Sequence, residues 1–145
     1  MSGSSIRLAG IVVGAVTLAA CGREKPAASA GAEQPSTPAY TDITPTQLHE
    51  MMQAKDFVLV NVHIPYAGDI PGTDLTIPFD QIAQHLDRLP ADKGAKIVLY
   101  CRSGRMSEEA STTLVSLGYN HVYNVAGGMR AWNDAGYPLE LRGER

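Results

Sequence analysis

Apolar runs of strand length alternate along most of the chain with stretches whose apolar residues recur at helical spacing. The nearly continuous apolar runs predict strands at 57–62, 75–77, 96–100 and 121–125. The helical spacing predicts helices at 45–52, 80–89, 107–117 and 129–135. Such an alternation is typical of an α/β fold, in which helices cover both faces of a mostly parallel sheet.

Three of these helices have recognisable ends or faces. Thr44, Pro45 and Gln47 form the pattern of a capping box with proline in the first helical position. Gly118 is expected to end the helix at 107–117. The residues expected to face the core are Ala110, Leu114 and Leu117 in that helix, and Ile82, Leu86 and Leu89 in the helix at 80–89.

Residues 1–20 have the composition of an export signal, with a short polar start and an almost wholly apolar stretch from Leu8 to Ala20. The apolar stretch is too short to span a bilayer, which takes about 20 residues. Leu18-Ala19-Ala20-Cys21 resembles a bacterial lipobox, and this resemblance implies cleavage before Cys21 and lipidation of that cysteine. Acyl chains on Cys21 would hold the protein at a membrane surface.

Residues 21–41 are interpreted as the lipidated cysteine and a disordered linker, because Ala, Pro, Ser, Gly and Glu dominate without a hydrophobic period. Residues 42–145 are then the folded domain. By resemblance to proteobacterial lipoproteins, the absence of Asp at Gly22 favours the outer membrane. The expected location is therefore the periplasmic face of a bacterial membrane.

The second of the two cysteines, Cys101, lies between the strand at 96–100 and the helix at 107–117. Its loop contains Arg102, Gly104 and Arg105. A loop that leaves a buried strand and enters a helix directs backbone N–H groups inward, where they stabilise an anion. We therefore expect a thiolate nucleophile at Cys101 rather than a structural thiol. With Cys21 lipidated, Cys101 has no disulfide partner in its own chain.

Three segments of the sequence carry motifs. Cys-Arg-Ser-Gly-Arg-Met-Ser occupies 101–107, Gly-Gly-Met-Arg-Ala-Trp occupies 127–132, and Asn-Val-His at 61–63 precedes Asp-Ile-Pro-Gly-Thr at 69–73 and Ile-Pro at 77–78. They resemble, in the same order, the loop C-R-x-G-x-x-S, the signature G-G-x-x-A-W and an altered D-V-R…H-I-P-G-A…I-P segment of rhodanese-like sulfurtransferases. The resemblance covers about residues 40–140 and implies a rhodanese-like domain.

The resemblance implies sulfur transfer through a persulfide of Cys101, without a cofactor. The thiolate would take sulfane sulfur from a small anionic donor such as thiosulfate and pass it to a thiol or cyanide. The residues expected to bind the substrate are Arg102, Ser103, Gly104, Arg105, Met106 and His63. For His63, which should lie at the same edge of the sheet, a role as base or orienting group and a loop position without chemistry both stay open.

Three positions depart from the family's pattern. Asn61 replaces the usual Asp, His63 replaces the usual Arg, and Met106 replaces the Arg or Thr often found at that position of the loop. The first two changes remove an expected ion pair, and the third makes the pocket more apolar. Thiosulfate is therefore a poorer fit as the natural donor, whereas the nucleophile is unaffected.

Other chemistries fit the sequence less well. A cysteine phosphatase or arsenate reductase loop needs a phosphate-binding Arg at the position of Ser107. His49, His63, His85 and His121 lack ligand spacing, so no metal is expected. With 12 Lys and Arg against 15 Asp and Glu, no basic stripe for nucleic acid is expected. The alternative function is a rhodanese-fold module that carries or senses sulfur, or binds a partner, with negligible turnover.

Overall fold

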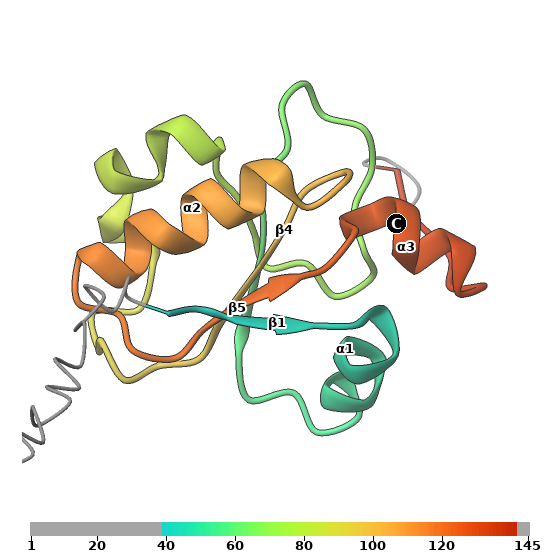
Figure 1. Ribbon diagram of the computed structural model, residues 1–145, viewed down its shortest axis with the longest axis horizontal. Coiled ribbons are helices and arrows are strands. Elements are labelled where there is room, and N and C mark those ends of the chain that lie inside the picture. Colours follow the sequence, from blue (N-terminus) through green and yellow to red (C-terminus); the bar gives the residue numbers. More distant parts are fainter. Residues whose placement is uncertain (1–38, 142–145) are drawn as a thin grey trace, which may run out of the picture. The chain divides into compact units, whose positions relative to one another are not determined.

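A five-stranded parallel sheet forms the centre of residues 39–141, which are the part of the chain that the computed structural model describes (Figure 1). The strands are β1 (Thr41–Ile43), β2 (Val58–Asn61), β3 (Leu75–Thr76), β4 (Ile97–Tyr100) and β5 (Val122–Val125). They lie in the order β1-β5-β4-β2-β3, and each neighbouring pair is parallel. The predicted α/β class and parallel sheet are confirmed.

Helices cover both faces of this sheet (Figure 1). The helical elements are α1 (Pro45–Met52), the 3₁₀ helices η1 (Phe79–Gln84) and η2 (Leu86–Arg88), α2 (Arg105–Ser116) and α3 (Gly128–Asp134). One core cluster joins the sheet to α2 and η1, and a second joins it to α1 and α3. Among residues 39–141, no helix has the length and apolar character that crossing a bilayer requires.

The alternation of side chains along β4 decides where its last residues point. Ile97 and Leu99 pack in the cluster on the α2 side, whereas Val98 and Tyr100 pack in the opposite cluster. Successive residues of a strand face opposite sides of the sheet. Cys101 continues this alternation and belongs to the cluster on the α2 side. Its thiol is therefore directed toward the start of the helix that follows it.

The start of α1 agrees with the predicted capping box. The hydroxyl of Thr44 accepts a hydrogen bond from the backbone N–H of Gln47 (3.2 Å), and the Gln47 side chain accepts one from the N–H of Thr44 (2.8 Å). Pro45 occupies the first helical position.

The sequence-based element boundaries need four corrections. The helix after Cys101 begins at Arg105 rather than at Ser107, so Arg105 and Met106 belong to its first turn. Strand β1 has only one buried residue, Ile43, so no apolar run predicts it, and it begins at Thr41, inside the stretch expected to be a linker. The expected helix at 80–89 is two 3₁₀ helices, because His85 between them leaves the helical conformation (φ −118°, ψ 32°). Leu117 is 39% exposed instead of buried, because α2 ends at Ser116 and Leu117 caps it.

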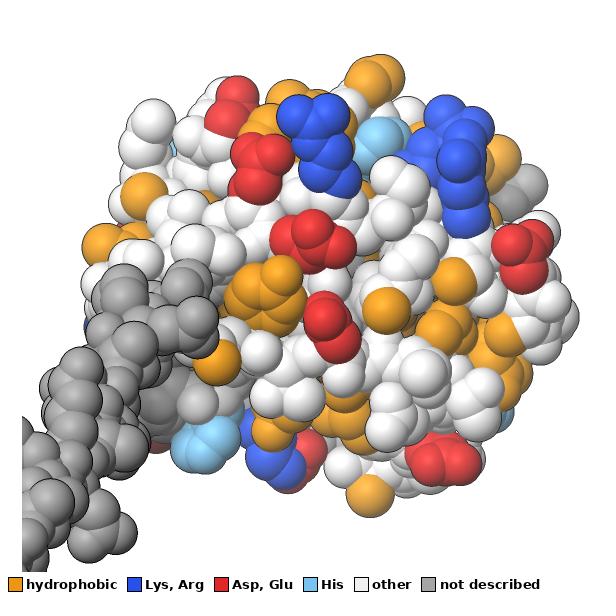
Figure 2. Space-filling model, in the orientation of Figure 1, with side chains coloured by type: hydrophobic (Ala, Val, Ile, Leu, Met, Phe, Trp, Pro, Cys, Tyr) orange, Lys and Arg blue, Asp and Glu red, His pale blue; other side chains and the backbone are white. Residues whose placement is uncertain are grey.

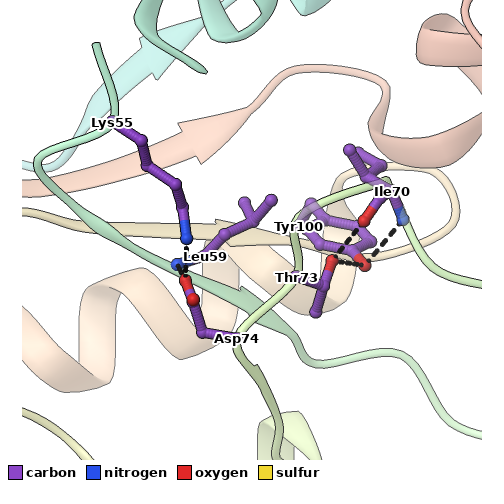
Figure 3. A network of polar contacts seen from close by, with 6 residues as sticks. All are labelled: Lys55, Leu59, Ile70, Thr73, Asp74 and Tyr100. Carbon is purple, nitrogen blue, oxygen red and sulfur yellow. Dashed lines mark hydrogen bonds and ion pairs between the residues drawn. The ribbon is translucent and has the colours of Figure 1, made fainter. Parts of the chain in front are cut away.

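Tyr100, the last residue of β4, anchors the segment that leads into β3 (Figure 3). Its hydroxyl accepts a hydrogen bond from the N–H of Ile70 (3.0 Å) and lies 2.7 Å from the hydroxyl of Thr73. Asp74 accepts hydrogen bonds from the N–H of Leu59 and from Lys55. Burial raises the pKa of Tyr100, so its hydroxyl stays protonated. The network fixes this segment against the sheet face opposite α2.

Candidate active site

The thiol of Cys101 lies in the turn between β4 and α2 and is almost completely buried, with 1% of the residue exposed. Its Sγ accepts a hydrogen bond from the backbone N–H of Gly104 at 3.0 Å. The hydroxyl of Ser107 lies 3.6 Å from Sγ and also 2.8 Å from the carbonyl oxygen of Gly104, and its single proton can be donated to either. Both groups can thus donate a hydrogen bond to the sulfur.

Gly104 makes this turn possible. Its φ of +103° is a conformation that residues with a side chain rarely adopt, and a Cβ there would lie 3.3 Å from the backbone nitrogen of Gly127. The turn leads directly into α2, which begins at Arg105. The free N–H groups at the start of α2 and the positive end of its dipole therefore lie on the same side as Sγ of Cys101, where they would stabilise an anionic sulfur.

A second segment, at the start of α3, holds the same turn from outside. The N–H of Met129 donates to the carbonyl oxygen of Cys101 (2.9 Å), and the N–H of Arg130 donates to that of Arg102 (3.0 Å). A Cβ at Gly128 would lie only 2.1 Å from the Cys101 carbonyl oxygen. The motifs at 101–107 and 127–132 are therefore in direct contact. They follow β4 and β5, which are neighbouring strands in the sheet.

The side chains that were expected to bind the substrate lie in different environments. Arg102, Ser103 and Arg105 are exposed, and Arg105 forms an ion pair with Glu109 (3.6 Å). Figure 2 shows basic side chains gathered along the edge of the molecule where, in Figure 1, the turn before α2 and the start of α3 lie. Met106 is half-buried and packs against the core cluster on the α2 side. Its side chain therefore supports the core rather than the surface of the turn.

His63 follows β2 and lies close enough to Arg102 to be influenced by its charge. Burial, and then the positive charge of Arg102, lower the pKa of His63, so that its imidazole is neutral at neutral pH. Its Nδ1 is buried and has no hydrogen-bond partner among residues 39–141. The predicted placement of His63 at the edge of the sheet near the cysteine turn agrees with this electrostatic contact.

Asn61 organises the turn that follows β2. Its side-chain amide donates to the carbonyl oxygen of Gly68 (2.8 Å) and to the carboxylate of Asp69 (2.9 Å). The hydroxyl of Tyr66 donates to the same carboxylate (2.9 Å). Asn61 thus has a structural function, because its amide links the end of β2 to the segment at Gly68 and Asp69.

The other histidines occupy separate positions. His49 stacks on Tyr137 with 4.4 Å between the ring centres, and Nδ1 of His121 lies 2.9 Å from the carbonyl oxygen of Gly94. Within residues 39–141, no three His, Cys, Asp or Glu side chains are grouped closely enough to hold a metal ion.

A pocket of about 630 Å³ opens beside the cysteine turn. Arg102, Arg130 and Asp134 provide its charged groups, and Ala67, Met129, Asn133 and Leu139 complete its lining. Cys101 does not line this pocket itself, but its neighbour Arg102 does. The hydrophobic pattern of the sequence does not predict this pocket, although the motif at 127–132 carries two of its lining residues, Met129 and Arg130.

This arrangement suits nucleophilic chemistry at sulfur. The Sγ has hydrogen-bond donors that stabilise a thiolate or a terminal persulfide sulfur, and cationic groups lie nearby on the surface. The described residues around Sγ do not provide the bidentate arginine contact that a bound phosphate would favour, because Ser107 stands at the expected position.

Comparison with known proteins agrees with this geometry. Residues 44–135 match the family model described as a rhodanese-like domain. The chain is 31% identical over 104 residues to the thiosulfate sulfurtransferase GlpE of Glaesserella parasuis, a match that covers 70% of this chain and 94% of that protein. A solved structure, a rhodanese-related protein from Thermoplasma volcanium, has a TM-score of 0.62 and 26% identity, and the match covers 71% of this chain and all (100%) of that one.

The same domain also matches part of a larger protein. A tRNA uridine(34) hydroxylase of Erwinia tasmaniensis is 31% identical over 108 residues, which cover 68% of this chain but only 31% of that protein. Likeness to the domain therefore does not by itself fix the reaction.

Proposed function

This chain belongs to the rhodanese-like family, and from that premise we propose that it is a sulfurtransferase that works through a persulfide of Cys101. In the first step the Cys101 thiolate attacks the sulfane sulfur of a donor such as thiosulfate. The donor's S–S bond breaks and its electron pair leaves with sulfite. In the second step cyanide or a thiol attacks the outer sulfur, the new S–S bond breaks, and the thiolate is regenerated.

The observation that carries this proposal is the environment of Sγ. The Gly104 N–H at 3.0 Å and the Ser107 hydroxyl at 3.6 Å are donors for an anionic sulfur in a position that water hardly reaches. A hydrogen bond to a charged group in such surroundings is stronger than one in water. Arg102, in the lining of the neighbouring pocket, and the exposed Arg105 would attract anionic donors.

The direct test is to load the full-length protein with thiosulfate and then add cyanide. We expect the intact mass to increase by one sulfur atom, peptide mapping to place that atom on Cys101, and cyanide to release it as thiocyanate with ping-pong kinetics. A protein that takes up no sulfur and forms no thiocyanate would instead favour the binding module.

Replacing Ser107 with alanine is expected to lower the sulfur-transfer rate about tenfold, because one donor to the anionic sulfur is lost. The matched control is Ser111→Ala, since Ser111 is a buried serine in the same helix whose hydroxyl has no hydrogen-bond partner among residues 39–141. Thiocyanate formation measures both variants. Equal rates for Ser107→Ala and Ser111→Ala would contradict the role of Ser107.

We further propose that the protein is a lipoprotein of the periplasmic face of a bacterial membrane, with the outer membrane favoured. The support is the sequence Leu18-Ala19-Ala20-Cys21 after an apolar stretch; these residues lie outside the described range. Expression with a labelled fatty acid should label the wild-type protein in the membrane fraction. The Cys21→Ser variant should carry no label, and a labelled variant would refute the anchor.

A further inference from the structure

The pocket beside the cysteine turn has the size and charge of a site for an organic molecule. We propose that it binds the acceptor of the sulfur, a thiol that carries a carboxylate, and that Arg130 is the residue that selects this carboxylate. This inference rests on the proposed sulfur transfer and adds a substrate class and a specificity-determining residue to it.

The volume and lining of the pocket favour an organic ligand over a small inorganic anion. Sites for organic ligands commonly have volumes of about 300–1,000 Å³, with apolar walls and a few polar groups, and this pocket has about 630 Å³. Ala67, Met129 and Leu139 offer apolar contact for a carbon skeleton. Thiosulfate has no carbon skeleton to use such walls.

The charges of the pocket favour a carboxylate. The lining contains two basic residues, Arg102 and Arg130, and one acidic residue, Asp134. Arg105 has Glu109 as an ion-pair partner, whereas Arg130 forms no ion pair within residues 39–141. A guanidinium group without a partner can bind a carboxylate through two parallel hydrogen bonds.

The backbone of Arg130 is hydrogen-bonded to the cysteine turn, the turn between β4 and α2. Its N–H donates to the carbonyl oxygen of Arg102 (3.0 Å), and the N–H of the preceding Met129 donates to that of Cys101 (2.9 Å). The backbone at Arg130 is therefore fixed relative to the backbone at Cys101, and the pocket that Arg130 lines also includes Arg102, the residue next to the nucleophile. Holding a reactant next to the group that it reacts with raises the rate of the reaction between them.

The step that this site would assist is the second half of the transfer. The acceptor thiolate attacks the outer sulfur of the Cys101 persulfide, a new S–S bond forms, and the bond between the two sulfurs of the persulfide breaks. The electron pair returns to Sγ of Cys101, and the product leaves as an organic persulfide anion. No oxidant or reductant beyond the acceptor is needed.

Two acceptors that differ in the carboxylate test the inference. The full-length protein is loaded with thiosulfate, freed of excess donor, and mixed with 3-mercaptopropionate or 2-mercaptoethanol, with rates compared per thiolate. In the wild type we expect faster discharge by 3-mercaptopropionate. The Arg130→Gln variant should lose about tenfold in kcat/KM for 3-mercaptopropionate and change less than about twofold for 2-mercaptoethanol.

Lys96→Gln is the charge-matched control. Lys96 immediately precedes β4 and pairs with Asp56 at the opposite end of the strand from Cys101. Its loss should leave both acceptors unaffected. An equal loss for both thiols in Arg130→Gln, or no loss for either, would overturn the inference.

A second measurement separates this inference from the proposed reaction. The unreactive thioether 3-(methylthio)propionate needs no persulfide, and its binding to the wild type and to Arg130→Gln can be followed by titration calorimetry. Weaker binding to the variant supports the site even if thiosulfate fails to load Cys101. Equal affinity for the two proteins overturns the site even if Cys101 does transfer sulfur.

Discussion

Replacing Cys101 with serine is expected to reduce thiocyanate formation by at least about 10³-fold, because the persulfide intermediate cannot form on a hydroxyl. The side chain is nearly isosteric, and its neighbours Gly104 and Ser107 can still make hydrogen bonds to an oxygen. The fold should therefore be retained, with the circular dichroism spectrum of the wild type. Thiosulfate and cyanide are the substrates for this measurement.

The matched control is the substitution of the other cysteine. Cys21→Ser removes a thiol from outside residues 39–141, and it should leave the rate of thiocyanate formation unchanged within about twofold. Turnover by Cys101→Ser close to that of the wild type would exclude the covalent mechanism. A loss in Cys21→Ser as large as in Cys101→Ser would point to a reaction that uses both thiols.

The second large effect is expected at Gly128. A Cβ at this position would lie 2.1 Å from the carbonyl oxygen of Cys101 and 2.9 Å from the carbonyl carbon of Arg102. These are backbone atoms that cannot move away without distorting the turn. Gly128→Ala should therefore lower the free energy of unfolding by more than about 3 kcal/mol and should also abolish sulfur transfer. Urea unfolding at equilibrium measures the first effect.

Gly118→Ala separates the steric contact from backbone strain. Both glycines have positive φ, +56° at Gly128 and +95° at Gly118, but a Cβ at Gly118 would have no atom within 4 Å. The Gly118 variant should lose only about 1 kcal/mol, which is the cost of a left-handed conformation. If the two variants are destabilised equally, the contact between Gly128 and the cysteine turn is not what makes glycine necessary there.

The sequence was sufficient to predict the elements that are long or strongly patterned. The apolar run at 96–100 and the helix after it placed Cys101 at the end of a central strand, and the capping box at Thr44 marked the start of α1. Strand β1 has a single buried residue and pairs only with β5, from a distant part of the chain, so no local pattern could reveal it. The interruption at His85, where φ is −118° and ψ is 32°, falls inside an unbroken helical spacing of apolar residues, so that spacing could not reveal it.

The same difference between local and long-range contacts explains why only part of the site could be predicted. Cys101, Gly104 and Arg102 lie on one continuous motif, and their proximity follows from chain order alone. The pocket depends on α3 meeting the cysteine turn across neighbouring strands, which periodicity cannot show. Arg130 was therefore missed as a candidate. The expectations for residues 1–38 lie outside the described range and stay predictions.

The hydrogen bonds from the start of α3 to the cysteine turn do not depend on the side chains that α3 carries there. The carbonyl groups of Cys101 and Arg102 accept hydrogen bonds from the main-chain N–H groups of Met129 and Arg130. Any amino acid other than proline supplies the same N–H at position 130, so exchange of that side chain leaves the nucleophile in place. Under the proposed sulfur transfer, a change at position 130 would alter the choice of acceptor and leave the cysteine turn intact, so position 130 is the first choice for a randomised library.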